Sequence, residues 1–164
     1  MSNVTVKNTT IKSFNYGVLL YVSSRNSIVE NNITHNTLGI YLQWYSSNNS
    51  IVGNNITENE GWGIYLWYSS SNNIVGNNIA DSDNGIELSS SSSNSIVGNN
   101  ITESNYTGIR LTRSSNNVLR DNSMASNRWN FLVLGSALSD FVNDVDASNT
   151  VDAKMSKTWV HREF

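Results

Sequence analysis

Apolar residues recur along this chain in a three-part unit whose parts are separated by short polar segments. The first part is a glycine followed by an apolar–any–apolar stretch, as in Gly-Ile-Tyr-Leu at residues 39–42. The second part is Asn-Ser-Ile at residues 49–51, and the third contains Asn54 followed two residues later by Ile56. Alternation in these stretches has a period of two residues, which is typical of strands and unlike the three- and four-residue spacing of a helix. Each unit therefore predicts three short strands.

The unit repeats five times with almost constant length. Its glycine occurs at Gly17, Gly39, Gly63, Gly85 and Gly108, with spacings of 22, 24, 22 and 23 residues. Three short strands cannot bury a hydrophobic face alone. Stacked units can, with successive strands about 4.8 Å apart and like residues placed on like residues inside. The repeat predicts an all-β fold, namely a right-handed single-stranded parallel β-helix with three short strands per coil and six to seven coils.

Two asparagine positions recur in every unit at the turns between strands. Side-chain amides stacked about 4.8 Å apart can hydrogen-bond to one another and to the turn backbone, and asparagine tolerates the left-handed conformation of a sharp bend. We therefore expect two asparagine ladders. They comprise Asn26, Asn49, Asn72, Asn94 and Asn117 in one column, and Asn31, Asn54, Asn77, Asn99 and Asn122 in the other. Replacing Asn77 by alanine is expected to destabilise the fold more than replacing Ser91, which we expect at the surface.

The repeat is less regular at both ends of the chain. We divide the chain into an N-terminal degenerate coil or cap at residues 1–16, five regular coils at 17–129, and the last coil with a C-terminal cap at 130–164. Solenoids need atypical ends, because an uncapped coil exposes a row of free backbone groups. Phe131, Phe141 and Trp159 are the large apolar residues of the expected C-terminal cap.

The unit at residues 39–57, with its Gly-Ile-Tyr-Leu and Ser-Ser-Asn-Asn-Ser-Ile-Val-Gly-Asn-Asn-Ile-Thr segments, resembles the repeats of the NosD-like parallel β-helix family. The resemblance covers about residues 4–151. Such repeats are also described as periplasmic copper-binding or as carbohydrate-binding and sugar-hydrolase repeats, and they are abundant in archaeal cell-surface proteins. The resemblance implies the fold and an extracellular or cell-surface location. It is unspecific for function, because the family description mixes copper handling, sugar binding and scaffolding.

Composition excludes several classes of partner. The net charge is -3 and charged residues make up 14% of the chain, so the basic surface of a nucleic-acid-binding protein is missing. No apolar run approaches the roughly 20 residues that span a bilayer, and we expect no membrane insertion. The first residues lack the basic and apolar regions of a signal peptide, so we expect the chain to be a fragment of a larger surface protein.

The residues that could bind copper are scattered. Copper prefers His, Met and Cys ligands, and the chain has no Cys but contains His35, His161, Met1, Met124 and Met155. These residues do not cluster in the repeat register, and Met124 occupies a core position. We therefore expect no metal site and no cofactor.

Carboxylates recur two residues after the isoleucine of the third strand in successive units. Glu58, Asp81 and Glu103 are expected to form an acidic column on the outer surface, either as solvated turn residues or as a weak catalytic rim. Hydrolysis of a glycosidic bond uses two carboxyl groups within roughly 5–10 Å of each other. Glu87 and Arg110 are adjacent on the outer face of the first strand, where we expect a surface ion pair of little energetic value.

Aromatic residues distinguish the second and third units from the others. Tyr41 and Tyr65 occupy the same outward position, with Trp67 two residues further along the strand, and Trp44 and Tyr68 share a nearby column whose orientation alternation leaves open. Large exposed rings suit stacking against a sugar or against another protein. The simpler interpretation is cross-strand packing that stabilises the sheet.

The sequence favours a non-enzymatic cell-surface β-helix module that serves as a scaffold or as a carbohydrate- or partner-binding face through these aromatic residues. A polysaccharide or a surface protein is the expected partner. The alternatives are a polysaccharide hydrolase or lyase that uses the acidic column, and a self-assembling fibre or surface-layer component in which open coil ends stack as an end-to-end homo-oligomer.

Overall fold

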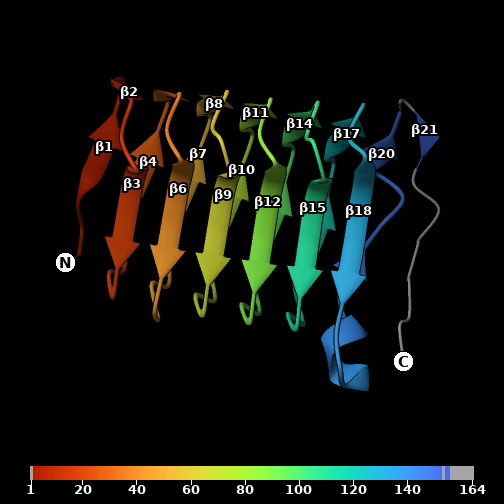
Figure 1. Ribbon diagram of the computed structural model, residues 1–164. Coiled ribbons are helices and arrows are strands. Elements are labelled where there is room, and N and C mark those ends of the chain that lie inside the picture. The colour runs from red at the N-terminus through yellow and green to blue at the C-terminus, as the bar shows by residue number, and fades with distance from the viewer. Residues whose placement is uncertain (1, 153, 156–164) are drawn as a thin grey trace.

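The chain winds into a stack of flat coils whose strands form three parallel sheets (Figure 1). This computed structural model describes residues 2–152 and 154–155. Successive coils follow one another from the N-terminal to the C-terminal end, and every coil up to β18 contributes one strand to each sheet. The fold is an all-β solenoid of about six turns, which confirms the parallel β-helix and the three strands per coil that the repeat predicts.

The strands differ in length between the sheets, with six-residue strands in one sheet and strands of two or three residues in the other two. The six-stranded sheet comprises β3 (Tyr16–Tyr21), β6 (Leu38–Gln43), β9 (Trp62–Trp67), β12 (Asn84–Ser89), β15 (Thr107–Thr112) and β18 (Trp129–Leu134). The seven-stranded sheet comprises β1 (Thr5–Lys7), β4 (Ser27–Val29), β7 (Ser50–Val52), β10 (Asn73–Val75), β13 (Ser95–Val97), β16 (Val118–Arg120) and β19 (Asp144–Val145). The eight-stranded sheet comprises β2 (Thr10–Lys12), β5 (Asn32–Thr34), β8 (Asn55–Thr57), β11 (Asn78–Ala80), β14 (Asn100–Thr102), β17 (Ser123–Ala125), β20 (Thr150–Val151) and β21 (Lys154–Met155).

The core is built from columns of identical residues. Ile51, Ile74 and Ile96 pair across β7, β10 and β13, and all three are fully buried. Complete burial of one such side chain stabilises the fold by about 1.5–3 kcal/mol. Each added coil therefore contributes a further stabilising side chain to the column. The long first strand closes the core with Ile and Leu at its inward positions, as in the paired Leu66 and Leu88.

Glycine begins the core-facing part of the long strand because a side chain does not fit there. A Cβ added to Gly85 would lie 2.4 Å from Cγ2 of Ile101 and 2.6 Å from the carbonyl oxygen of Gly108. The glycine column therefore lets the long strand approach the third strand of its own coil and the backbone of the next coil.

The two predicted asparagine ladders are confirmed, and the bonds of Asn77 show how they work. Its Oδ1 accepts hydrogen bonds from the backbone N–H and the Nδ2 of Asn54, both at 2.9 Å. Its Nδ2 donates to the carbonyl oxygen of Ile51 at 3.0 Å and to Oδ1 of Asn99 at 2.9 Å. One amide thus satisfies polar groups in the coils before and after its own, a pattern that needs an acceptor and two donors on one short side chain.

Serine forms a further buried column that the sequence interpretation missed. Ser91 is fully buried, so its expected surface position is wrong. Its hydroxyl accepts a hydrogen bond from the backbone of Ser69 at 2.9 Å and donates to backbone carbonyl oxygens of Leu66 and Ser89. The column satisfies the turn that follows the long strand. It comprises Ser23, Ser46, Ser69, Ser91 and Ser114.

The C-terminal part of the chain continues the stack after an interruption. The 3-10 helix η1 (Leu138–Phe141) follows β18 and projects beyond the end of that strand (Figure 1). The chain then returns to pair β19 with β16 and β20 with β17, and Asn143 and Asn149 extend the two asparagine ladders. The antiparallel pairing of β21 with β20 ends the parallel order. Phe131 and Phe141 pack against the core, whereas Trp159 lies outside the described residues.

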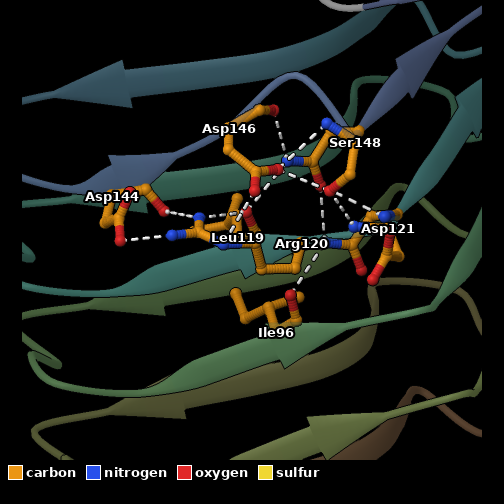
Figure 2. A network of polar contacts seen from close by, with 9 residues as sticks. Ile96, Leu119, Arg120, Asp121, Asp144, Asp146 and Ser148 are labelled. Carbon is orange, nitrogen blue, oxygen red and sulfur yellow. Dashed lines mark hydrogen bonds and ion pairs between the residues drawn. The ribbon is translucent and has the colours of Figure 1, made fainter.

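Ionic contacts attach this last coil to the regular stack (Figure 2). The Arg120 guanidinium lies between the carboxylates of Asp144 and Asp146, with 2.9 Å from its Nε to Oδ2 of Asp146. The other oxygen of Asp146 accepts hydrogen bonds from the hydroxyl and backbone N–H of Ser148. Together with Arg120, these bonds hold the pKa of Asp146 below its ordinary value of 3.8.

Replacing Asn77 by alanine should destabilise the protein strongly, because the change leaves Asn54 and the carbonyl of Ile51 without their buried partner. Each unpaired buried group costs on the order of 1–3 kcal/mol. Asn73→Ala is the matched control, since Asn73 is exposed in the same coil. Thermal and urea unfolding should show a clearly lower stability for Asn77→Ala only. Equal loss in the two variants would contradict the ladder as the source of stability.

The Asp146 contacts predict a pH-dependent attachment of the last coil. A carboxyl group with a depressed folded pKa stabilises the fold above its unfolded pKa, and this contribution is lost as the pH falls through the folded pKa. Asp146→Asn should therefore lower the Tm at pH 7, and the difference from the unmodified protein should shrink as the pH falls below 3.8. Asp81→Asn, at an exposed turn, is the control. A Tm difference for Asp146→Asn that stays constant down to pH 2.5 would rule out this linkage.

Candidate aromatic face and groove

Tyrosine and tryptophan are concentrated on one sheet. Among the described residues, every Tyr and Trp lies in a strand of the six-stranded sheet or within two residues of a strand end. They are Tyr16, Tyr21, Tyr41, Trp44, Tyr45, Trp62, Tyr65, Trp67, Tyr68, Tyr106 and Trp129. In β6 and β9 the inward positions are occupied by Ile and Leu, so Tyr41, Tyr65 and Trp67 project outward as alternation predicts. Tyr16, Trp62 and Trp129 are the first residues of their strands and precede the alternating core positions.

Tyr41 and Tyr65 pair in register on the outer surface, and their rings stack on each other. The ring centroids are 5.1 Å apart at an interplanar angle of 7°, and Trp62 stacks on Tyr65 at 5.0 Å. Because each ring covers its neighbour, Tyr41 is only 9% exposed. Burial, followed by the nearby Tyr65 and Tyr16, raises the pKa of Tyr41 from 10.0 to about 12. This column offers ring edges and hydroxyl groups to a ligand, since its ring faces are occupied.

Trp44, Trp67 and Tyr68 form a second cluster at the far end of the same strands. Trp44 stacks on Tyr68 with centroids 5.1 Å apart and lies 4.6 Å from Trp67 in a tilted arrangement. The orientation of Trp44 and Tyr68, left open by the sequence, is outward. Both residues have positive φ, which ends the strand alternation at the turn. Tyr68 is 40% exposed and the adjoining Tyr45 is 72% exposed, so this cluster has the most accessible ring surface near β6 and β9.

Glu87 and Arg110 do not form the fully exposed ion pair that the sequence suggested. Glu87 is buried beneath the aromatic column, where its Oε2 accepts a hydrogen bond from Nε1 of Trp62 at 2.6 Å. Its Oε1 lies 3.6 Å from Nε of Arg110. The hydrogen bond from Trp62 and the 6% exposure show that the carboxylate is enclosed by its neighbours. Glu87 is therefore part of the floor of the aromatic face.

A groove lies next to this pair, where the sheet lacks large side chains for two coils. One column of the sheet runs Trp62, Asn84, Thr107, Trp129, so two small polar residues separate two tryptophans. The groove has a volume of about 480 Å³. Its lining consists of Trp62, Asp83, Asn84, Tyr106, Thr107, Arg110, Trp129 and Leu132.

The acidic column lies elsewhere, on the turns after the eight-stranded sheet. Glu58, Asp81 and Glu103 are exposed, and each has a left-handed backbone conformation. The backbone register places them on consecutive coils as predicted. Glu58 forms an ion pair with His35, with 2.7 Å between its Oε2 and the His Nε2. The residues follow the surface of the turns, and none of the three lines the groove beside Trp62.

The described residues do not fit a copper site. His35 is paired with Glu58, and Met124 is buried in the hydrophobic core. Residues 2–152 contain no group of three His, Cys, Asp or Glu side chains placed to hold a metal ion. Met1 and His161 lie outside the described residues, as does the side chain of Met155.

The sequence interpretation did not single out the groove, although the repeat length carries a signal for it. The segment before the strand glycine has three residues between Asn59 and Gly63 and between Ser104 and Gly108. In the intervening coil, Ser82 and Gly85 are separated by only two residues. The longer segments carry Trp62 and Tyr106, so departures from the regular repeat place aromatic rings beside the groove.

A comparison with protein families matches residues 1–157 to the family described as periplasmic copper-binding protein (NosD). No curated protein sequence matches the chain significantly. The described residues contain no helix long and apolar enough to cross a membrane.

Solved structures with the same fold include two enzymes. The periplasmic alginate epimerase AlgG superposes with a TM-score of 0.76 at 17% identity, covering 90% of this chain and 38% of that chain. DFA-IIIase from Arthrobacter chlorophenolicus A6, without its lid, superposes with a TM-score of 0.64 at 15% identity, covering 83% of this chain and 33% of that chain. The chain thus spans well under half the length of either structure. At such low identity the likeness shows the fold alone.

Proposed function

We propose, since this chain belongs to the NosD family of periplasmic proteins, that it is a non-enzymatic module of the cell envelope or cell surface that binds carbohydrate on its six-stranded sheet. The observation that carries this proposal is the restriction of every described Tyr and Trp to that sheet and its strand ends. The core cluster contains none of these rings, and the ladders are built from asparagine and serine, so the stack does not require the aromatic residues to lie on one sheet.

The accessible rings suit a flat, partly apolar ligand. Sugar rings present C–H groups on their faces and hydroxyl groups at their edges, so they stack on aromatic faces while hydrogen-bonding at the rim. The cluster of Trp44, Trp67 and Tyr68 provides ring surface, whereas the mutual stacking of Tyr41 and Tyr65 makes the face rigid. A rigid face loses little conformational entropy when a ligand binds.

The enzyme alternative depends on the acidic column, which supports it less well. Glu58, Asp81 and Glu103 are solvated, and Glu58 is paired with His35. They lie on the turns between the eight-stranded and six-stranded sheets, and none of them lines the groove. A hydrolase or lyase needs a substrate held against two carboxyl groups, and none of these three residues lines the groove described above.

Replacing both Trp67 and Tyr68 by alanine should weaken carbohydrate binding. The two rings supply much of the exposed aromatic surface near β6 and β9, and loss of such contacts typically lowers affinity about tenfold or more. Isothermal titration calorimetry with a panel of neutral and acidic polysaccharides measures this effect. Val75→Ala, on the outer face of the seven-stranded sheet, is the matched surface control and should bind as the unmodified protein does.

The same mixtures distinguish binding from catalysis. Absence of heat with every glycan would reject the carbohydrate-binding proposal. Release of reducing ends or unsaturated products that disappears in Glu58→Ala or Asp81→Ala would replace it with the enzyme alternative.

A further inference from the structure

The groove between Trp62 and Trp129 has the size and shape of a site for a single small ring. The two tryptophans occupy one column three strand spacings apart, which corresponds to about 14 Å between their backbones. Asn84 and Thr107 form the floor between them, and both are buried. The volume of about 480 Å³ falls in the ordinary range of ligand sites, roughly 300–1,000 Å³.

Two polar atoms at this groove lack a partner within the protein. They are Oδ1 of Asn84, whose residue is only 6% exposed, and Nε of Arg110, which has no hydrogen bond because Oε1 of Glu87 is 3.6 Å away. Most buried polar atoms in folded proteins are hydrogen-bonded, because an unpaired one costs about 1–3 kcal/mol. Asn84 lies three residues before Glu87, the residue of β12 that pairs with Arg110 of β15. Both Asn84 and Arg110 line the groove, so one ligand in it can engage both side chains.

The pairing of one donor with one acceptor indicates hydroxyl groups on the ligand. A hydroxyl both donates and accepts, so two neighbouring hydroxyls of one sugar ring would satisfy Asn84 and Arg110 together. A carboxylate would satisfy Arg110 but would give Asn84 no donor.

The charges around the groove also disfavour an anion. Glu87 lies 3.6 Å from Arg110 and offsets its positive charge, and Asp83 adds a second carboxylate at the rim. Arg128 is the remaining cation nearby, and its guanidinium lies over the Trp129 ring at 4.6 Å. Two carboxylates and two guanidinium groups therefore lie at or near the groove, and an electrically neutral ligand suits this balance best.

We infer that this groove is a subsite for one neutral pyranose residue of a polysaccharide. Asn84 accepts from one ring hydroxyl, Arg110 donates to its neighbour, and Trp62 and Trp129 enclose the ring from both sides. The inference rests on the proposed carbohydrate-binding function and gives it a second, more specific site on the same sheet. The aromatic cluster at Trp67 and Tyr68 would then contact other residues of the same glycan.

Two substitutions in the groove test the inference against a matched control. Asn84→Leu removes the acceptor while keeping the branched shape of the side chain, and Arg110→Met removes the donor while keeping the aliphatic stem. Arg113→Met is the control, because Arg113 is exposed at the end of β15 and does not line the groove. Calorimetry uses cellohexaose, mannohexaose and xylohexaose as neutral probes and oligogalacturonate and oligomannuronate of the same length as acidic probes.

We expect at least one neutral probe to bind, with affinity reduced tenfold or more in Asn84→Leu and Arg110→Met and unchanged in Arg113→Met. Asn84→Leu should keep or raise the Tm, since the atom that it removes has no partner in the protein. A structural role for Asn84 would instead lower the Tm, so the two readouts separate binding from folding.

Three results would overturn the inference in distinguishable ways. Unchanged binding in both groove variants, together with loss in the Trp67 and Tyr68 double variant, would reject the groove as a sugar subsite and leave the proposed function standing. Preference for the acidic probes would contradict a neutral pyranose. Absence of binding by every probe would reject both the sugar subsite and the proposed carbohydrate-binding function.

Discussion

The hydrogen bonds of the stacked asparagine amides are the interaction on which the rest of the structure depends. Each coil turns sharply and leaves backbone groups inside the stack, where water cannot reach them. An asparagine such as Asn77 satisfies these groups on both sides through one amide. Burial of the isoleucines stabilises every column, but it does not specify where the chain bends. The ladders fix the bends, and the bends place each strand above the equivalent strand of the preceding coil.

The repetitive part of this structure could be predicted from the sequence because every coil carries the same residue types at the same positions. The recurrent Asn26 and Asn31 columns, the glycines and the isoleucines each point to one position in the coil, and the register follows from them. The same reasoning missed the buried serine column, since Ser91 lies in a run of serines that looks like a solvated loop. Its burial depends on the turn conformation, which composition does not reveal. The continuation of the ladders by Asn143 and Asn149 escaped notice because η1 separates them from the regular repeat.

The groove could not be predicted in the same way because it arises from a difference between coils. Asn84 and Thr107 are unremarkable alone, and they form a floor only because Trp62 and Trp129 stand on either side in the same column. Burial of Glu87 likewise depends on Trp62 in the preceding coil covering it. Identical residues build the stack, whereas the departures from identity collect on one sheet. This division lets the outer surface vary while the ladders and the core stay intact.

The central claim is that a ligand binds where the coils differ, on the six-stranded sheet. The most direct test is to map a bound neutral glycan by two-dimensional ¹⁵N–¹H nuclear magnetic resonance. The account predicts that cellohexaose, mannohexaose or xylohexaose shifts the indole signals of Trp62 and Trp129 and the side-chain amide of Asn84. The backbone amides of Glu58, Asp81 and Glu103 should remain unchanged. Perturbation centred on that acidic column, with the Trp62 and Trp129 signals unmoved, would contradict the account.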